Sequence, residues 1–435
     1  MLANACMKHV IRGLTALALG SATLMSAAAV QSAELKMWIL SGRPAHVQFL
    51  TEAEAEFRNR HPDFKLTLEL IANDRYKTQL PIGMTGSNPP DVYFNWAGEY
   101  ASRFAKDGLA LDITEAGALE GGFKQYISDA WQSSFTVDGH NYGVPTEAVS
   151  KYFFYDKTFF ADHNLAIPST FNELLGLCKA VRAIDPSIVP WPLGNSERWI
   201  VNHVVTMLNE RVLGNANTAA DYDLSASEDV LFTDPGYVTA WEKLLELQDA
   251  DCFQEAVNAT SPESADQLFQ AQISPFTFCG SWCIGNFLRE GYEDFALFRF
   301  PMIEGGKGDA TATFLVPQGY QVSAKTTQPE LAAEWVSFLV SNEQAVNFAR
   351  LMGAIPSNPT LIEQVGGSEQ YNWVAKDIGE SSDSVMVLNV LLENAVSEAY
   401  LDAGVEVLNR TKTPAEAMEM IRAVALESKA KLAGI

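Results

Sequence analysis

Residues 34–70, ELKMWILSGRPAHVQFLTEAEAEFRNRHPDFKLTLEL, decide the fold class of this chain. The run 34–40 is short and apolar, which is typical of a buried strand. After the loop 41–44, side chains recur at helical spacing at His46, Leu50, Ala53 and Phe57. The stretch 64–70 then alternates apolar and polar residues, as a half-buried strand does. Strand, helix and strand in this order predict a βαβ unit, whose parallel sheet gathers its loops at one edge.

The rest of the chain continues this alternation of helices and strands. Helix starts are indicated where an oxygen-bearing side chain can accept from the amides of a first turn. These starts are Thr170 with Glu173, Asp234 before Pro235, Ser261 before Pro262, and Thr413 with Glu416. Strand-like runs occur at 91–94, 151–155, 295–300 and 314–322. The predicted fold class is therefore α/β.

The N-terminus is typical of a secretory signal. Lys8, His9 and Arg12 precede an uncharged, small-residue-rich stretch at 13–30, and no second long apolar run follows. We expect residues 1–33 to be removed near Ala33, which favours a periplasmic location over a retained membrane anchor.

The charge of the chain restricts its partners. The sequence carries a formal net charge of −24 at pH 7. Such a surface repels phosphate backbones and anionic lipid headgroups, so we expect neither nucleic acid nor a membrane surface as a partner. A neutral or cationic partner fits this charge.

Five cysteines are present, and Cys6 lies in the predicted signal. The other four, Cys178, Cys252, Cys279 and Cys283, permit three pairings in an oxidising compartment. Cys178 lies on the apolar stripe of a predicted helix, which favours a buried, unreacted thiol. Cys279 and Cys283 lack the two-residue spacing of zinc or redox motifs, so we expect no metal. The sequence carries no phosphate-cradling or dinucleotide-binding motif, so we also expect no cofactor.

A large aromatic side chain follows a tight turn in FTFCGSW, residues 276–282. The turn Gly280–Ser281 holds Trp282 near the surface, where its ring can meet a partner before it meets the protein's own core. Trp282 is therefore a candidate binding residue.

Several segments together resemble a known family. They are LKMWIL at 35–40, NPPDVYFNWAGEYASRFAKDGLALDI at 88–113, the stretch 138–174, FCGSW at 278–282, and the stretch 317–357. In this order they resemble the family 1 extracellular solute-binding proteins of ABC importers, which include maltose-binding and other sugar-binding proteins. No single motif is specific, but their ordered succession covers nearly the whole mature chain.

The resemblance implies the two-lobed, type II periplasmic-binding-protein fold, with each lobe a sheet flanked by helices and the ligand cleft between them. It places residues 34–146 and 321–354 in an N-terminal lobe, and residues 147–320 and 355–435 in a C-terminal lobe. It also implies a monomer that captures a mono- or oligosaccharide and delivers it to the transmembrane subunits of an ABC permease.

A saccharide site needs flat aromatic walls for the C–H face of a sugar, together with donors and acceptors for its hydroxyls. In the family, a tryptophan after a small-residue turn stacks on the sugar, and Trp282 with Gly280 matches that position. Trp96 follows the strand at 91–94, beside Asn95 and shortly before Glu99. We favour the site over core packing for both tryptophans, whereas Glu99 is equally a surface carboxylate.

Other candidates lie in loops and at the predicted lobe crossings. Arg43 follows the first strand and is suited either to forked hydrogen bonds with hydroxyls or an acidic substituent of a ligand, which leaves an anionic sugar open, or to a surface ion pair. Asn195 and Trp199 belong to WPLGNSERW at 191–199, where Trp199 is either a wall of the site or the first buried residue of a helix. Glu147, Tyr320 and Arg350 complete the candidates; an arginine near a helix end also serves its own C-terminus.

Two rival functions are weighed against sugar binding. A secreted carbohydrate-active hydrolase also has a sugar-stacking cleft and needs a carboxylate pair, which a chain with 54 Asp and Glu supplies by chance. The chain has no GxSxG or HExxH motif and its six histidines do not cluster, so we expect no enzyme. A ferric-ion binder favours adjacent tyrosines, and only Tyr152 and Tyr155 are near one another in this way.

Overall fold

The computed structural model describes residues 33–127 and 129–434. The predicted signal peptide, residues 1–33, lies outside the described residues except for Ala33. None of the described helices combines the length and the apolar character that a membrane crossing needs.

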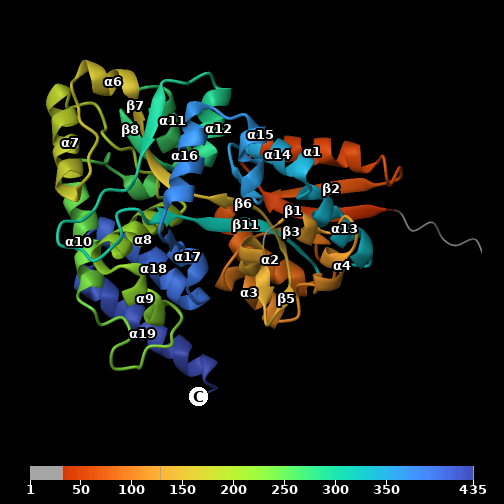
Figure 1. Cartoon of the computed structure of the whole chain (residues 1–435). Helices are drawn as coiled ribbons and strands as arrows, with labels where there is room; N and C mark the ends of the chain where they lie inside the picture. Colours follow the sequence, from red (N-terminus) through yellow and green to blue (C-terminus); the bar gives the residue numbers. More distant parts are fainter. Residues whose placement is uncertain (1–32, 128, 435) are drawn as a thin grey trace, which may run out of the picture. The chain divides into compact units, whose positions relative to one another are not determined.

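A six-stranded mixed sheet forms the first layer of the fold (Figure 1). β1 (Glu34–Leu40) pairs in parallel with β2 (Lys65–Ile71) on one side and with β3 (Val92–Trp96) on the other. The helix α1 (Pro44–Phe57) connects β1 to β2, so the βαβ unit predicted from residues 34–70 is confirmed. The sheet continues through antiparallel strands in the order β3, β11 (Val316–Val322), β6 (Val144–Val149) and β12 (Ile355–Pro356).

Helices cover both faces of this sheet. In Figure 1, α1 and α14 (Asn342–Met352) lie on one side of it, and α2 (Asn73–Thr85) and α3 (Glu99–Lys106) on the other. Phe49 of α1 packs edge to face on Phe348 of α14, with ring centroids 5.0 Å apart. α13 (Pro329–Leu339) adds the buried Trp335 to the same core.

A smaller antiparallel sheet follows directly along the chain. β6 ends at Val149, Ser150 intervenes, and β7 (Lys151–Asp156) begins the second sheet between β8 (Phe276–Gly280) and β9 (Phe295–Phe298). α11 (Pro262–Gln270) and α12 (Trp282–Arg289) pack on this sheet. The lobe crossings that the resemblance implies, near 145–149, 318–320 and 353–357, overlap β6, β11 and β12; the lobe boundaries themselves stay predictions.

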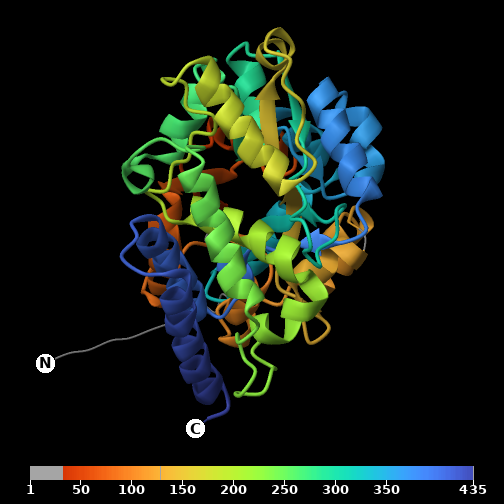
Figure 2. The ribbon, with the colours of Figure 1, turned by 90° about the vertical axis from the view of Figure 1, so that its left-hand side faces the viewer.

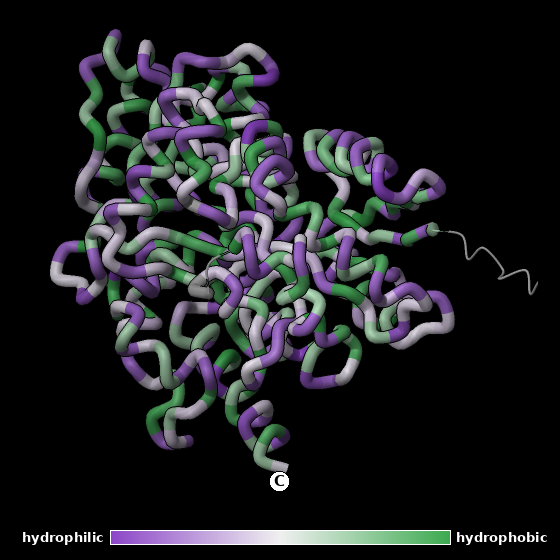
Figure 3. Tube along the Cα trace, turned by 45° about the vertical axis from the view of Figure 1, so that its right-hand side comes forward, coloured by the Kyte–Doolittle hydropathy of each residue, from purple (hydrophilic) through white to green (hydrophobic). Residues whose placement is uncertain are grey.

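A helical layer lies beyond the small sheet, with the C-terminal helix in dark blue in Figure 2. Its main members are α7 (Phe171–Ile184), α8 (Trp199–Leu213), α10 (Gly236–Asp249), α18 (Asn394–Leu408) and α19 (Pro414–Leu432). In Figure 3, hydrophilic stretches recur along the outer helices and loops, and hydrophobic stretches run through the interior. The fold is thus mixed α/β, as predicted.

Shorter elements complete the chain. They are α4 (Thr114–Ala118), α5 (Asp129–Gln132), β4 (Thr136–Val137), β5 (His140–Asn141), α6 (Lys157–Asp162), α9 (Asn215–Tyr222), β10 (Thr313–Phe314), α15 (Ile362–Val365), α16 (Glu369–Glu380), β13 (Ser384–Val385), α17 (Leu388–Leu391), and the 3₁₀ turns η1 (Phe123–Gln125), η2 (Ser133–Phe135), η3 (Val257–Ala259) and η4 (Pro359–Leu361).

The cysteine pairing corrects one expectation. Cys178 of α7 is joined to Cys252, just after α10, across a sequence separation of 74 residues. The expectation of a free Cys178 thiol is therefore wrong, because the apolar stripe of α7 faces the segment that ends α10. Cys279 and Cys283 form a second disulfide, which spans the turn before α12.

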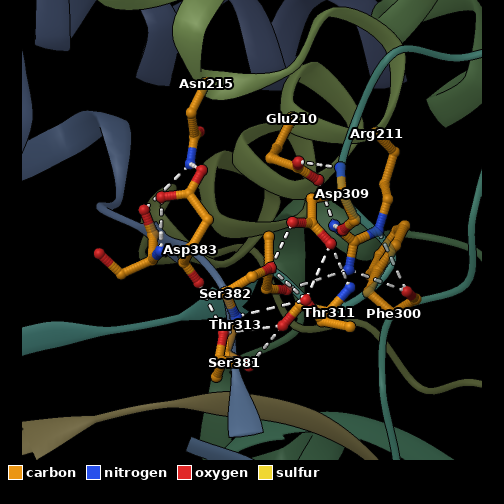
Figure 4. A network of polar contacts seen from close by, with 12 residues as sticks. Glu210, Arg211, Asn215, Phe300, Asp309, Thr311, Thr313, Ser381, Ser382 and Asp383 are labelled. Carbon is orange, nitrogen blue, oxygen red and sulfur yellow. Dashed lines mark hydrogen bonds and ion pairs between the residues drawn. The ribbon is translucent and has the colours of Figure 1, made fainter.

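A buried polar network ties α8 to the loop before β10 (Figure 4). The Arg211 side chain, with none of its surface exposed, pairs with the Glu210 carboxylate and donates to the carbonyl oxygens of Phe300 and Ala312, both at 3.2 Å. The Asp309 amide donates to Glu210 at 2.8 Å. The buried charges are therefore paired, which is the condition for keeping them inside a protein.

Candidate ligand-binding site

One cavity of about 220 Å³ gathers residues from the six-stranded sheet with its adjoining loops and from the helices α8, α11 and α12. The loop after β1, the end of β3 and helix α2 supply Arg43, Trp96 and Lys77. The starts of α8 and α12 supply Trp199 and Trp282. Four of the residues predicted from the sequence, Arg43, Trp96, Trp199 and Trp282, therefore line a single cavity, although they are up to 239 positions apart in the sequence.

Trp282 owes its position to the glycine before it. It is the first residue of α12, two residues after Gly280 ends β8. Its ring lies back against Gly280, where a Cβ atom would come within 1.9 Å of a ring carbon. Only a residue without a side chain leaves this space, so Gly280 contributes room for the indole and does not itself line the cavity.

Trp199 forms a corner with Trp282. The two indoles meet edge to face, with centroids 6.2 Å apart and planes inclined at 61°. Trp199 is the first residue of α8, and its Nε1 donates to the Glu197 carboxylate at 2.8 Å. The N-cap before it, Arg198, forms ion pairs with Glu398 and Asp402 of α18. These contacts hold the ring at the cavity and out of the helical core.

Trp96 lies at the carboxyl end of β3, where ligand loops gather in parallel sheets. Its ring packs edge to face on Phe94 and Tyr100, with centroids 4.9 Å and 5.5 Å away. The Lys77 ammonium lies 5.1 Å from the ring centroid, a cation–π distance. Only 7% of Trp96 is exposed, so the ring serves both the core and the cavity wall.

Arg43 joins the cavity to the strand that leads into the small sheet. It donates to Glu147 of β6 at 2.9 Å, and Glu147 is 2% exposed. A guanidinium has five donors, and this pair uses one of them. Glu147 thus positions Arg43 and does not line the cavity.

The other predicted residues are held in internal contacts. Tyr320 is fully buried and its hydroxyl contacts His46, whose pKa burial holds well below its usual range. Asn95 bonds to Gln321, and Asn195 accepts from the Val201 amide in the first turn of α8. Glu99 pairs with Lys106, and Arg350 donates to the carbonyl oxygens of Gln364 and Val365. None of these five lines the cavity as the structure has it.

Sequence reasoning missed Asp266, which lines the cavity from α11. This side chain is partly buried, and burial raises its pKa to about 7 against the lowering effect of Lys151. No motif marks it, since it occurs in SPESADQLF as an ordinary helical acid.

Sequence reasoning also missed Lys151, the first residue of β7. It is 3% exposed, and in the described part of the chain its Nζ has no hydrogen-bond partner. Nζ lies 5.2 Å from the Trp199 centroid and 5.0 Å from that of Phe278. Burial lowers the pKa of Lys151 to about 7, and Asp266 partly opposes this shift.

His203 and Arg289 were also not predicted from the sequence, and both line the cavity. Burial, with the charges of Lys151 and Lys77, holds the pKa of His203 well below its usual range, so its imidazole is neutral near pH 7. Arg289 of α12 also lines the cavity and donates to Asn286 at 2.7 Å.

One group of potential metal ligands lies beside the cavity. Asp266, Cys279 and Cys283 place their ligand atoms within 4.8 Å of one another. The two sulfurs are bonded to each other, however, so they are not thiolates and offer a metal ion little.

Comparison with solved structures defines the class of the fold. The chain superposes on a chitin oligosaccharide binding protein with a TM-score of 0.82 at 21% identity, over 92% of this chain and 100% of the other. It superposes on the maltose-bound MalE3 of T. maritima with a TM-score of 0.75 at 18% identity, over 90% and 98% of the two chains. The protein thus has the two-lobed, type II periplasmic-binding-protein fold.

The family follows from the sequence comparison. Residues 45–346 match the bacterial extracellular solute-binding protein family, and the chain belongs to it. It is 25% identical to an uncharacterized ABC transporter extracellular-binding protein of Pyrococcus horikoshii, over 72% of this chain and 70% of that protein. It is 22% identical to the maltodextrin-binding protein MdxE of Bacillus subtilis, over 74% and 73% of the two chains.

Proposed function

We propose that the protein is the substrate-binding component of an ABC-type carbohydrate importer. It captures a mono- or oligosaccharide in the cavity described above and delivers it to the transmembrane subunits of the permease as a periplasmic monomer. The observation that carries this proposal is the grouping of Trp96, Trp199 and Trp282 on one cavity in a chain of this family. The flat face of an indole suits the apolar face of a pyranose ring. Relatives and structural neighbours of the chain are named for maltodextrin, chitin oligosaccharide and raffinose.

The cavity is lined by the six-stranded sheet on one side and by helices such as α8 and α12 on the other, and this links its occupancy to conformation. A saccharide contacts the residues on both sides of the cavity only when the two sides lie close together. Its binding therefore shifts the equilibrium between an open and a closed conformation toward the closed one. A micromolar dissociation constant corresponds to about −8 kcal/mol, which stacked rings and several hydrogen bonds supply after ordering costs.

The test is a thermal-shift screen followed by calorimetry. The probes are maltotriose, raffinose, diacetylchitobiose, xylotriose and galactose. We expect at least one to raise the melting temperature, since a ligand that binds only the native state stabilises it, and to reduce the radius of gyration in X-ray scattering. Absence of both changes for every probe contradicts the proposal.

Trp282→Ala tests the cavity itself. We expect this variant to lose at least tenfold in affinity, which corresponds to about 1.4 kcal/mol, while it still unfolds in a single cooperative thermal transition. Trp373→Ala is the matched control, because Trp373 is also partly buried but packs on Tyr152 away from the cavity. Equal affinities of Trp282→Ala and the wild type remove Trp282 from the site.

The rival function is a secreted carbohydrate-active hydrolase. Three carboxylates, Glu197, Glu263 and Asp266, line the cavity and motivate the test. The purified protein is incubated with the same oligosaccharides and the products are separated by chromatography. We expect no turnover, and steady product formation favours the hydrolase.

A further inference from the structure

The cavity contains a carboxylate without a conventional donor. Asp266 lines the cavity, and its Oδ2 lies 3.6 Å from the sulfur of Cys279 and 3.6 Å from that of Cys283. These sulfurs are joined in a disulfide, so neither carries a proton to donate. Among residues 33–127 and 129–434, no N–H or O–H group donates to this carboxylate. A partly buried acceptor in this position is satisfied only by a group that enters the cavity.

The positive charge of Lys151 attracts the Asp266 carboxylate, but the Lys151 ammonium does not donate a hydrogen bond to it. The two side chains attract each other electrostatically, but they form no ion pair within 4.0 Å, and Lys151 Nζ remains between the rings of Trp199 and Phe278. The Asp266 oxygens therefore remain available to hydrogen-bond donors of a ligand.

The neighbouring acids have other roles. Glu197 accepts from Trp199 Nε1 at 2.8 Å and so holds one wall of the cavity. Glu263 is exposed in the first turn of α11, where a carboxylate favours the helix N-terminus. Asp266 is one turn further along and is bounded by the Cys279–Cys283 disulfide that flanks Trp282. Asp266 therefore lies close to the strand end and helix start that position Trp282, and both side chains line the same cavity.

We propose that Asp266 is the specificity-determining acceptor of the cavity, which takes hydrogen bonds from hydroxyl groups of a neutral saccharide stacked on Trp282. This inference rests on the proposed function and deepens it. Hydrogen bonds to an ionised carboxylate are roughly twice as strong as those between neutral groups. A uronic acid whose carboxylate lies against Asp266 brings two like charges together in a partly desolvated site, and their repulsion disfavours it there.

The first test replaces the carboxylate by its amide. Asp266→Asn is expected to lose at least tenfold in affinity for whichever of maltotriose, raffinose, diacetylchitobiose, xylotriose or galactose binds the wild type. Glu290→Gln removes the same kind of charge from the exposed end of α12, outside the cavity lining, and is expected to change the affinity less than threefold. Glucuronic and galacturonic acids in large excess are expected not to displace the bound saccharide from the wild type.

The second test is the pH profile, which a structural role does not move. The pKa of Asp266 is raised to about 7, so its carboxyl ionises between about pH 5.5 and about pH 8.5. We expect wild-type affinity to rise over this interval and that of Asp266→Asn to stay flat. Lys151→Met removes the charge that lowers the Asp266 pKa and is expected to move the midpoint of the rise to higher pH. Lys151, whose pKa is also lowered to about 7, loses its proton over the same interval. The other charged groups that line the cavity are Arg43, Lys77, Glu197, Glu263 and Arg289, and His203 stays neutral in this range.

The outcomes separate the two proposals. If no saccharide binds the wild type, the proposed function fails and this inference fails with it. If a saccharide binds and Asp266→Asn retains its affinity and pH profile, only this inference is overturned. Displacement of the saccharide by a uronic acid also overturns it. Should Asp266→Asn not fold, the midpoint shift in Lys151→Met decides: an unchanged midpoint overturns the inference.

Discussion

Gly280 shows how a single missing side chain shapes the site. Its backbone lies directly beneath the Trp282 ring, where a methyl group has no space. We predict that Gly280→Ala displaces the indole and lowers saccharide affinity at least tenfold, as measured by calorimetry. Gly176→Ala is the matched control: it lies in α7 with open space around it, so the added methyl is expected to stabilise the helix by up to about 1 kcal/mol. Unchanged affinity in Gly280→Ala contradicts the packing argument.

Lys151 destabilises the folded protein at low pH. Its pKa falls from 10.5 to about 7 on folding, so the unfolded chain binds more protons between these values and stability rises with pH across them. We predict that Lys151→Met raises the free energy of unfolding by about 1 to 3 kcal/mol near pH 5.5, where Asp266 is protonated. The gain should shrink toward zero near pH 10.5.

Chemical denaturation at several pH values measures this difference. Lys179→Met is the control, because Lys179 is an exposed residue of α7. It should change the free energy of unfolding by less than about 0.5 kcal/mol at every pH. A Lys151→Met gain that does not vary with pH contradicts burial of the charge as its cause.

At the scale of elements, local chemistry predicted where helices begin. Thr170 and Thr413 both form capping boxes with the glutamate three residues later, and Ser261 caps α11. We predict that Thr413→Ala lowers the free energy of unfolding by about 1 kcal/mol, because the amide of Glu416 loses its acceptor. Thr413→Ser, which keeps the hydroxyl, should remain close to the wild type in the same denaturant titration.

The Cys178–Cys252 disulfide connects elements that are distant in sequence. It closes a loop with a separation of 74 residues, and a cross-link of this length stabilises by about 4 kcal/mol. We predict that the double variant Cys178→Ser, Cys252→Ser melts at a lower temperature by calorimetry but retains its saccharide affinity, since neither residue lines the cavity. A loss of affinity in the folded double variant contradicts this separation of roles.

Most elements were predictable because their signals are local. The strand at 34–40, the helix after it and the capped helix starts depend on neighbouring residues in sequence. That β2 lies at the edge of its sheet, with Leu70 48% exposed, was not predictable. An edge strand shows the same alternation of apolar and polar residues as a half-buried strand inside the sheet. The pairing of Cys178 depends on how α7 meets the end of α10, which no local pattern encodes.

Of the residues that line the cavity, three tryptophans and Arg43 were predictable from the sequence. Trp96, Trp199 and Trp282 occur at turns and element ends, which is a visible signal. Asp266 and Lys151 have no such signal, because a helical acid and a lysine at a strand start are ordinary surface residues until the fold buries them. Glu147 and Tyr320 were predicted near the crossing strands, where the structure places them in contacts that support Arg43 and His46.

At the scale of the whole molecule, net charge governs stability. A formal charge of −24 repels itself in the compact state more than in the expanded one. We predict that raising sodium chloride from about 0.01 M to about 0.3 M increases the melting temperature, because the Debye length shortens from about 30 Å to below 10 Å. Potassium chloride should act equally, and a decrease in melting temperature contradicts charge repulsion as the dominant effect of salt.

The corner made by Trp199 and Trp282 also gives the protein an optical property. Two indoles 6.2 Å apart and inclined at 61° couple their excited states, and such a chiral pair produces two far-ultraviolet dichroic bands of opposite sign. A solute that lies against one ring changes the surroundings of one chromophore more than those of the other and unbalances the couplet. The protein thus carries its own dichroic reporter of cavity occupancy, which needs no label.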